Sequence, residues 1–128
     1  MSYFKGLLQT NLQVRDIKSS VNWYVQKLQL IVIADYGTTV VLSFSNSSKY
    51  EGGIDETPVL CLIENKESPI QSSTYPVLQI SDNMCEKLYE HLQQNGVSVE
   101  MNPTHHGHFK FYDPDGNVLE AFCPSIYK

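Results

Sequence analysis

Apolar and polar residues alternate along short segments of this chain, and two longer segments carry apolar residues at intervals of three and four. Alternation predicts strands, because successive strand side chains point to opposite faces. Intervals of three and four predict helices with one apolar face. The segments follow the order strand, helix, strand, strand, strand, and this order occurs twice. The strands are expected at about 9–14, around 31–33, at 38–45, 58–64 and 75–80, around 97–99, and at 108–112 and 117–122.

The two halves are related by an internal repeat with an offset of 66 residues. Leu12-Gln13-Val14-Arg15-Asp16 aligns with Leu78-Gln79-Ile80-Ser81-Asp82, with three identities and one Val/Ile exchange over five positions. In each copy the Asp can cap the following helix by accepting a bond from a backbone N–H. We therefore expect one domain over residues 1–128, with module one at about 7–64, a linker at about 65–73 and module two at about 74–124.

Both predicted helices follow these aspartates. The first is expected from about Ile17 to Leu28, with one face directed inward that carries Val21, Tyr24, Val25 and Leu28. The second is expected from about Met84 to Asn95, and Gly96 is a suitable stop because glycine adopts positive φ at no steric cost. Its inward residues are expected to be Met84, Leu88, and His91 or Leu92.

One face of the strands is polar. On the first strand Thr10, Leu12 and Val14 are expected to pack under the helix, which leaves Gln9, Asn11 and Gln13 on the other face. The same period leaves Tyr75, Val77, Gln79, His108, Lys110, Tyr112 and Glu120 on the corresponding face of the second copy. A polar face can simply be solvated. Glu120 argues against that interpretation, because it is a carboxylate among apolar and aromatic neighbours.

The most informative motif lies near the C-terminus, at Phe111-Tyr112-Asp113-Pro114-Asp115-Gly116-Asn117-Val118-Leu119-Glu120. Pro fixes φ at the second turn position, Asp bonds the local backbone, and Gly supplies positive φ, so the motif predicts a tight turn between two strands. This hairpin resembles the last hairpin of the vicinal oxygen chelate superfamily, which includes glyoxalases, bleomycin-resistance proteins and extradiol dioxygenases. The resemblance, with the repeat, implies an α+β fold in which two βαβββ modules form a curled mixed sheet around a cup-shaped cavity. It also implies a homodimer.

The resemblance places metal ligands at equivalent points of the two modules. Those points are Gln9 and Tyr75 on the first strands, and Cys61 and Glu120 on the last strands. Glu120 matches the family pattern and Gln9 is an accepted variant, whereas Tyr75 and Cys61 are unusual ligands. The implied cofactor is a divalent metal such as Mn, Ni, Zn or Fe, held by Glu120 and Gln9, but the incomplete set favours a protein without the full metal site.

Other residues near Glu120 leave several roles open. Thr104-His105-His106-Gly107-His108 offers three imidazoles in a segment that is more simply a polar loop entering a strand. His108 and Glu120 would form an acid–base pair or two ligands of a displaced metal site if they face the same cavity. Lys110 would instead neutralise Glu120 or create an anion-recognising pocket.

Composition narrows the function classes. A length of 128 residues and 41% apolar residues describe one globular domain. The net charge of −5 disfavours nucleic-acid binding. No run of 18 apolar residues and no secretion signal occur, so we expect a cytoplasmic protein that does not enter membranes. The cysteines, Cys61, Cys85 and Cys123, are expected to be reduced.

Three functions are compatible with these observations. The first is binding of a small molecule in the cup, with Gln9, Asn11, Tyr75, Gln79, Lys110 and Tyr112 as ligand-binding residues. The alternative is a metal-dependent lyase or isomerase of the glyoxalase type, in which Glu120 and Gln9 bind the metal and Glu120 and His108 are catalytic. The third, a non-catalytic subunit that works through its outer surface, has no specific support in the sequence.

Overall fold

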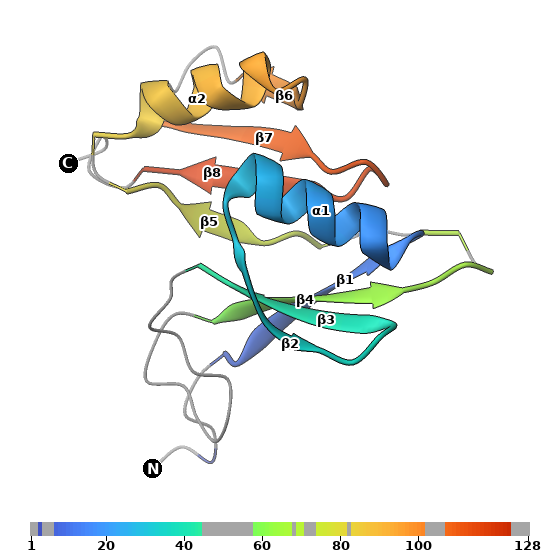
Figure 1. Cartoon of the computed structure of the whole chain (residues 1–128). Helices are drawn as coiled ribbons and strands as arrows, with labels where there is room; N and C mark the ends of the chain where they lie inside the picture. The colour runs from blue at the N-terminus through green and yellow to red at the C-terminus, as the bar shows by residue number, and fades with distance from the viewer. Residues whose placement is uncertain are drawn as a thin grey trace. The chain divides into compact units, whose positions relative to one another are not determined.

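A computed structural model describes residues 3, 7–44, 58–67, 69–70, 74–81, 83–101 and 107–123. Residues 45–57, linker residues 68 and 71–73, and His105 and His106 lie outside the described residues. The chain divides into two compact units, unit one over residues 1–70 and unit two over residues 71–128. Each unit contains one βαβββ module, as Figure 1 shows by its element labels. This confirms the predicted fold class. The cup involves both modules and stays a prediction.

Unit one contains one helix and a four-stranded mixed sheet. Its strand order is β1-β4-β3-β2, with β1 parallel to β4 and the other pairs antiparallel. Helix α1 contacts β3 and β4. Buried Leu12, Val14, Leu60, Leu62 and Leu42 form the core on this side of the sheet. The elements are β1 (Gln9–Val14), α1 (Ile17–Leu28), β2 (Ile31–Asp35), β3 (Thr39–Ser43) and β4 (Val59–Glu64).

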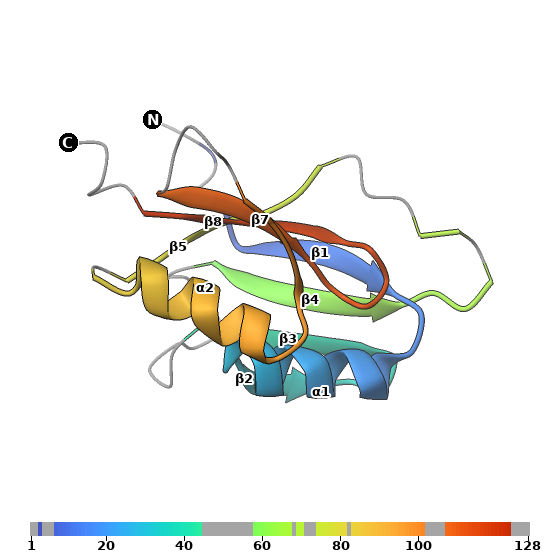
Figure 2. The same cartoon turned by 90° about the horizontal axis from the view of Figure 1, so that it is seen from above.

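Unit two repeats this topology with the strand order β5-β8-β7-β6. Again the first strand is parallel to the last, β5 to β8, and the remaining pairs are antiparallel. Figure 1 and Figure 2 both show β5, β8 and β7 next to one another in this sheet. The elements are β5 (Val77–Gln79), α2 (Cys85–Gln94), β6 (Ser98–Met101), β7 (His108–Tyr112) and β8 (Val118–Phe122).

The start of α1 agrees with the position and the cap predicted from the sequence. The side chain of Asp16 accepts a hydrogen bond from the Ser19 N–H at 3.1 Å, as predicted for the cap. Glu64 from the end of β4 accepts a second bond from the Ile17 N–H at 2.9 Å. Two of the free N–H groups at the helix start are therefore satisfied. The buried side of α1 differs in part from the prediction, because it carries Ile17, Ser20 and Tyr24.

Helix α2 starts within one residue of the predicted position, but the orientation of Met84 differs from the prediction. Met84 holds the N-cap position, its side chain makes no capping bond, and its side chain is 43% exposed rather than directed inward. The Met84 N–H instead bonds the Ser81 carbonyl at 3.1 Å, and Asn83 adopts a positive φ of 66°. This turn delays the helix to Cys85, and the proposed cap Asp82 lies outside the described residues. Leu92 is fully buried and Gly96 ends the helix with φ 73°, as expected.

The turn between β7 and β8 depends on Asp113, whose side chain is 5% exposed. One carboxylate oxygen accepts the backbone N–H groups of Asp115 and Asn117 at 2.9 and 2.8 Å. The other accepts the Asn117 side-chain amide at 2.9 Å. Gly116 has φ 82°, and its N–H bonds the Asp113 carbonyl at 3.0 Å. The predicted Asp-Pro-Asp-Gly turn is confirmed, and its hydrogen bonds are almost entirely buried.

The described part of the chain contains no helix of the length and hydropathy that crossing a membrane requires.

Replacing Asn117 by Ala should lower the free energy of unfolding by about 1–3 kcal/mol, because the buried Asp113 carboxylate then loses a hydrogen bond. Chemical denaturation monitored by circular dichroism measures the change. The control is Asn22→Ala, which removes the same group from an exposed position on α1 and should change stability by less than about 0.5 kcal/mol. Equal effects at both positions would contradict a special role for the turn.

The cap of α1 predicts a pH-dependent contribution to stability. The hydrogen bond from the Ser19 backbone N–H holds the pKa of Asp16 below its usual value. A carboxyl with a lowered folded-state pKa contributes stability that is present above the unfolded-state pKa of about 3.9 and is lost as pH falls through the folded value. The thermal midpoint of the protein minus that of Asp16→Asn should therefore be constant above about pH 5 and shrink below about pH 4. A pH-independent difference would exclude this origin.

Candidate functional site

One face of the unit-two sheet carries the residues that the sequence singled out. Glu120 on β8 lies directly opposite Lys110 on β7 and Val77 on β5. Directly opposite residues share a face of a sheet, and so do residues two apart on one strand. We call this surface the Glu120 face; it carries Tyr75, Val77, Gln79, Glu100, His108, Lys110, Tyr112, Val118, Glu120 and Phe122. The four predicted ligand-binding residues of unit two and the catalytic candidates His108 and Glu120 thus lie on one surface.

Helix α2 covers the opposite face. Its Tyr89 ring meets the Phe109 ring edge to face, with centroids 5.4 Å apart. Phe109 and Phe111 are each 2% exposed, whereas His108, Lys110 and Tyr112 between and beside them are half-buried. The alternation along β7 therefore agrees with the predicted inward and outward faces. The helix of unit two does not shield the Glu120 face.

Lys110 and Tyr75 form a cation–π contact on this face. The Lys110 Nζ lies 5.0 Å from the centroid of the Tyr75 ring, within the range in which an ammonium is attracted to an aromatic face. Tyr75 precedes β5, and β8 lies between β5 and β7 in the sheet. The side chain of Lys110 must therefore cross over β8 to reach Tyr75. This places a positive charge over the strand that carries Glu120.

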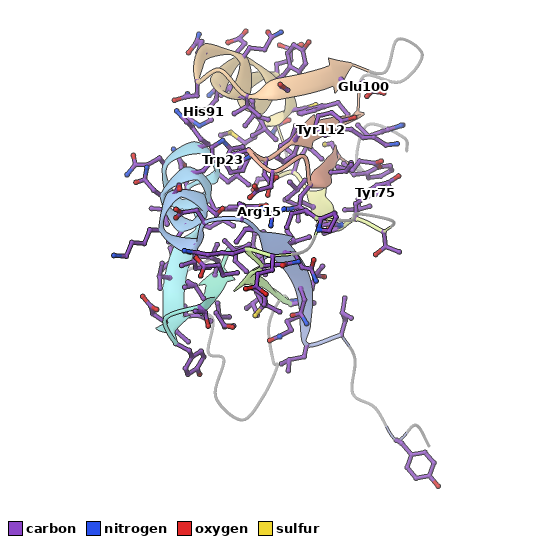
Figure 3. All side chains as sticks on the ribbon, turned by 90° about the vertical axis from the view of Figure 1, so that its right-hand side faces the viewer. Arg15, Trp23, Tyr75, His91, Glu100 and Tyr112 are labelled. Carbon is purple, nitrogen blue, oxygen red and sulfur yellow. The ribbon has the colours of Figure 1, made fainter. Side chains whose placement is uncertain are left out.

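Tyr112 and Glu100 form a second polar contact. The Tyr112 hydroxyl donates a hydrogen bond to Glu100 Oε2 at 2.7 Å, and this bond raises the pKa of Tyr112. Figure 3 labels Tyr112, Glu100 and Tyr75 on the same side of this sheet. Glu100 was not among the predicted site residues. The alternation along 98–101, which puts Ser98 and Glu100 on one face, was a usable signal in the sequence, and the structure shows that Glu100 lies opposite Lys110.

His108 stacks against an aromatic residue. Its ring lies nearly parallel to that of Phe122, directly opposite on β8, with an interplanar angle of 19° and centroids 5.5 Å apart. The stack fixes the imidazole at the end of β7, two residues from Lys110. Its role as a catalytic residue stays a prediction.

Glu120 itself is half-buried. Among the residues that the structure describes, its carboxylate accepts no hydrogen bond and forms no ion pair. The neighbouring Glu100, by contrast, is engaged by Tyr112. A half-buried carboxylate without a protein partner is costly unless water or a guest molecule supplies donors. Glu120 is therefore available to bind a ligand on this face.

The corresponding surface of unit one has different chemistry. Cys61 on β4 lies opposite Asn11 on β1, and Asn11 precedes Val77 by the repeat offset of 66 residues, so Cys61 is the positional counterpart of Glu120. Cys61 is 3% exposed and packs with Val41 and Val59. Burial raises the pKa of the Cys61 thiol, and a hydrogen bond with Gln9 offsets this only in part. At neutral pH Cys61 is therefore an uncharged thiol.

The remaining polar residues of unit one hydrogen-bond to one another. The Gln9 amide donates to Asn11 Oδ1 at 2.9 Å, and the Asn65 amide donates to Gln13 Oε1 at 3.1 Å. Asn11 and Gln13 are exposed and Gln9 is half-buried, in agreement with their predicted face. Their binding roles stay predictions, because each amide group here has a partner within unit one.

These observations test whether a divalent metal fits the four positions at which the family resemblance places ligands, Gln9, Cys61, Tyr75 and Glu120. Of the four positions, only Glu120 offers an open charged ligand. Cys61 is a buried neutral thiol, Gln9 is a neutral amide whose Nε2 donates to Asn11, and Tyr75 carries the Lys110 ammonium on its ring. Metal ligands must be deprotonated and numerous, and a neighbouring ammonium opposes a dication. Within the described ranges no three His, Cys, Asp or Glu side chains are grouped to hold a metal ion. The residues present do not fit the metal.

A cavity of about 480 Å³ lies elsewhere, beside α1 in unit one. Its volume is within the range of small-molecule sites. None of the predicted site residues lines it. Its lining consists of Ile17, Lys18, Val21, Asn22, Val25, Asp35, Gly37 and Val40.

Comparison with known proteins identifies the family of this chain and solved structures with a similar fold. The family model described as Glyoxalase/Bleomycin resistance protein/Dioxygenase superfamily matches residues 6–121. A comparison with the sequences of curated proteins found no significant match.

Several solved structures share the fold at low identity. An integron cassette protein from the mobile metagenome of a Halifax Harbour sewage outfall is 23% identical, with a TM-score of 0.71 over 94% of this chain and 99% of that one. The antibiotic binding protein TnmS3 from a Streptomyces species is 20% identical, with a TM-score of 0.72 over 96% and 98%. The fosfomycin resistance protein FosX from Listeria monocytogenes, complexed with Mn(II) and sulfate, is 16% identical, with a TM-score of 0.70 over 94% and 90%.

The donor set predicts that the protein retains little metal. Protein purified without added metal or chelator should contain well below one equivalent of Mn, Fe, Ni or Zn per chain, because a single open carboxylate binds a divalent ion weakly. Inductively coupled plasma mass spectrometry measures the content, with Glu120→Gln as the control for binding elsewhere. A stoichiometric metal that disappears in Glu120→Gln would contradict the prediction.

Proposed function

Because the chain belongs to the Glyoxalase/Bleomycin resistance protein/Dioxygenase superfamily, we propose that it binds a small organic molecule on the Glu120 face, without a metal. The observation that carries this proposal is the open, half-buried carboxylate of Glu120 on a surface rich in aromatic side chains. Ligand sites combine apolar and aromatic contact area with a few polar groups that fix orientation. The similarity to an antibiotic binding protein is consistent with such a role.

Each part of the Glu120 face has a role in the proposed complex. Tyr75 is 39% exposed and offers a ring edge and face to a planar ligand. Gln79, exposed at the end of β5, offers an amide donor and acceptor. Glu120 accepts N–H or O–H donors, and Lys110 donates to oxygens. For Gln9 and Asn11 of unit one, a binding role stays a prediction that follows from the family resemblance alone.

A metal-dependent lyase or isomerase of the glyoxalase type is the second candidate function. The same open carboxylate favours it, since Glu120 is available as a metal ligand. The similarity to FosX, a protein complexed with Mn(II), is consistent with it. The chemistry of Gln9, Cys61 and Tyr75 weighs against it, so we place it second. Retention of one metal per chain, dependent on Glu120, would reverse this order.

A thermal-shift screen of a diverse library of small organic molecules should yield ligands that raise the melting temperature. Isothermal titration of the best ligand should show affinity lowered about tenfold or more by Glu120→Ala and by Tyr75→Ala, because each removes a polar anchor or a stacking surface. The control is Glu90→Ala, which removes an exposed carboxylate from α2 and should leave affinity unchanged.

The ligand could bind in the cavity beside α1 instead of on the Glu120 face, and a further variant tests this location. Val21→Lys would place a charge in that cavity while leaving the Glu120 face intact. A ligand whose binding survives Glu120→Ala and Tyr75→Ala but is lost in Val21→Lys would contradict the proposed location. A library without any ligand would contradict the proposed function.

A further inference from the structure

Lys110 and Glu120 carry opposite charges at directly opposite positions, yet they do not form an ion pair. Side chains at such positions have Cβ atoms about 5 Å apart, so an ion pair is within reach. Both residues are half-buried. The ammonium lies instead over the Tyr75 ring, at 5.0 Å from its centroid. In the described part of the chain, neither charged group has a hydrogen-bond or ion-pair partner.

Glu100, the other charged residue directly opposite Lys110, does not form an ion pair with it. Glu100 lies opposite Lys110 on the other side, but its carboxylate accepts the Tyr112 hydroxyl at 2.7 Å and its side chain is exposed. The Tyr75 ring satisfies one side of the ammonium and leaves its remaining N–H groups available, because an ammonium has three donors. The face therefore presents the Lys110 ammonium, a hydrogen-bond donor, next to the Glu120 carboxylate, a hydrogen-bond acceptor. Each group is available to bind a ligand.

A simple ion should bind weakly at this pair. An anion bound at Lys110 is repelled by the Glu120 carboxylate at nearly the same distance, and a cation bound at Glu120 is repelled by the Lys110 ammonium. Coulomb attraction and repulsion of similar size then largely cancel. A ligand that carries an anionic group next to a hydrogen-bond donor avoids this repulsion. Its anionic group can bind the Lys110 ammonium while its donor binds the Glu120 carboxylate. When the donor is an ammonium, the ligand also adds no net charge to the half-buried surface.

We propose that Lys110 and Glu120 together select ligands in which a carboxylate is adjacent to an amine or hydroxyl donor, as in an α-amino or α-hydroxy acid. The carboxylate accepts from the Lys110 ammonium, and the donor bonds the Glu120 carboxylate. The aromatic residues Tyr75 and Phe122 on the same face favour an aromatic substituent on that acid. This inference rests on the proposed function and names the ligand class of the same site.

Four probes with one shared benzyl group separate the two contacts. L-Phenylalanine and L-phenyllactate carry both the carboxylate and the donor. 3-Phenylpropionate lacks the donor, and L-phenylalaninamide lacks the carboxylate. Isothermal titration or ligand-observed NMR should give affinities about tenfold higher for the first two probes, because each provides one more charge-assisted hydrogen bond. Equal affinity across all four would overturn the inference.

Two variants assign the contacts to residues. Lys110→Met keeps the length of the side chain without its charge, and should abolish the preference for phenylalanine over phenylalaninamide. Glu120→Gln is isosteric and should abolish the preference for phenylalanine over phenylpropionate. The matched controls are Lys87→Met and Glu90→Gln on α2, where both residues are exposed, and these should keep both preferences. Melting temperatures verify folding, with Lys110→Gln as the replacement if Lys110→Met is unstable.

The outcomes distinguish this inference from the function on which it rests. If no probe binds but the library yields other ligands that require Glu120, the ligand class is wrong and the proposed function stands. If neither the probes nor the library yield a ligand, both fail. Preferences that persist in Lys110→Met and Glu120→Gln would show that the two side chains do not select the ligand.

Discussion

The buried carboxylate of Asp113 fixes the register of β7 and β8, and the chemistry of the Glu120 face depends on that register. Three hydrogen bonds to Asp113 close the turn, from two backbone N–H groups and the Asn117 amide. A slip of one residue would exchange the faces of a strand. Glu120 would then enter the apolar side under α2, and Leu119 would take its place. The turn therefore determines that Glu120 and Lys110 stand opposite each other.

The repeated topology shows how one backbone supports two kinds of surface. In both units the first strand pairs in parallel with the last, so equivalent residues occupy equivalent sites. Val41 and Cys61 are paired in unit one as Lys110 and Glu120 are in unit two. The unit-one pair is buried among apolar side chains, whereas the unit-two pair is half-buried and charged. At this pair of equivalent positions, the charged groups thus lie in the second copy.

This asymmetry is the reason that we do not expect family membership alone to bring a metal site. A dication needs several deprotonated ligands at once. Here one equivalent position is a neutral buried thiol, and another is a tyrosine ring that already faces an ammonium. The positive charge beside Glu120 is supplied by Lys110. Membership fixes the backbone, while the side chains at four positions decide which charge is present and what kind of ligand suits it.

The sequence by itself determined the two βαβββ modules, the bounds of α1, β1 and β7, and the turn at Asp113, because these follow from local periodicity, capping and turn chemistry. It also placed Glu120, Lys110 and Tyr75 on one face, since strand alternation is a local property. The inward orientation predicted for Met84 was wrong, because the turn through Asn83 places Met84 at the N-cap with its side chain exposed. Only the tertiary structure decided that Lys110 contacts Tyr75 rather than Glu120, and that Glu100 engages Tyr112. Those contacts depend on strand order and side-chain reach across β8, which join residues distant in sequence and leave no periodic trace in it.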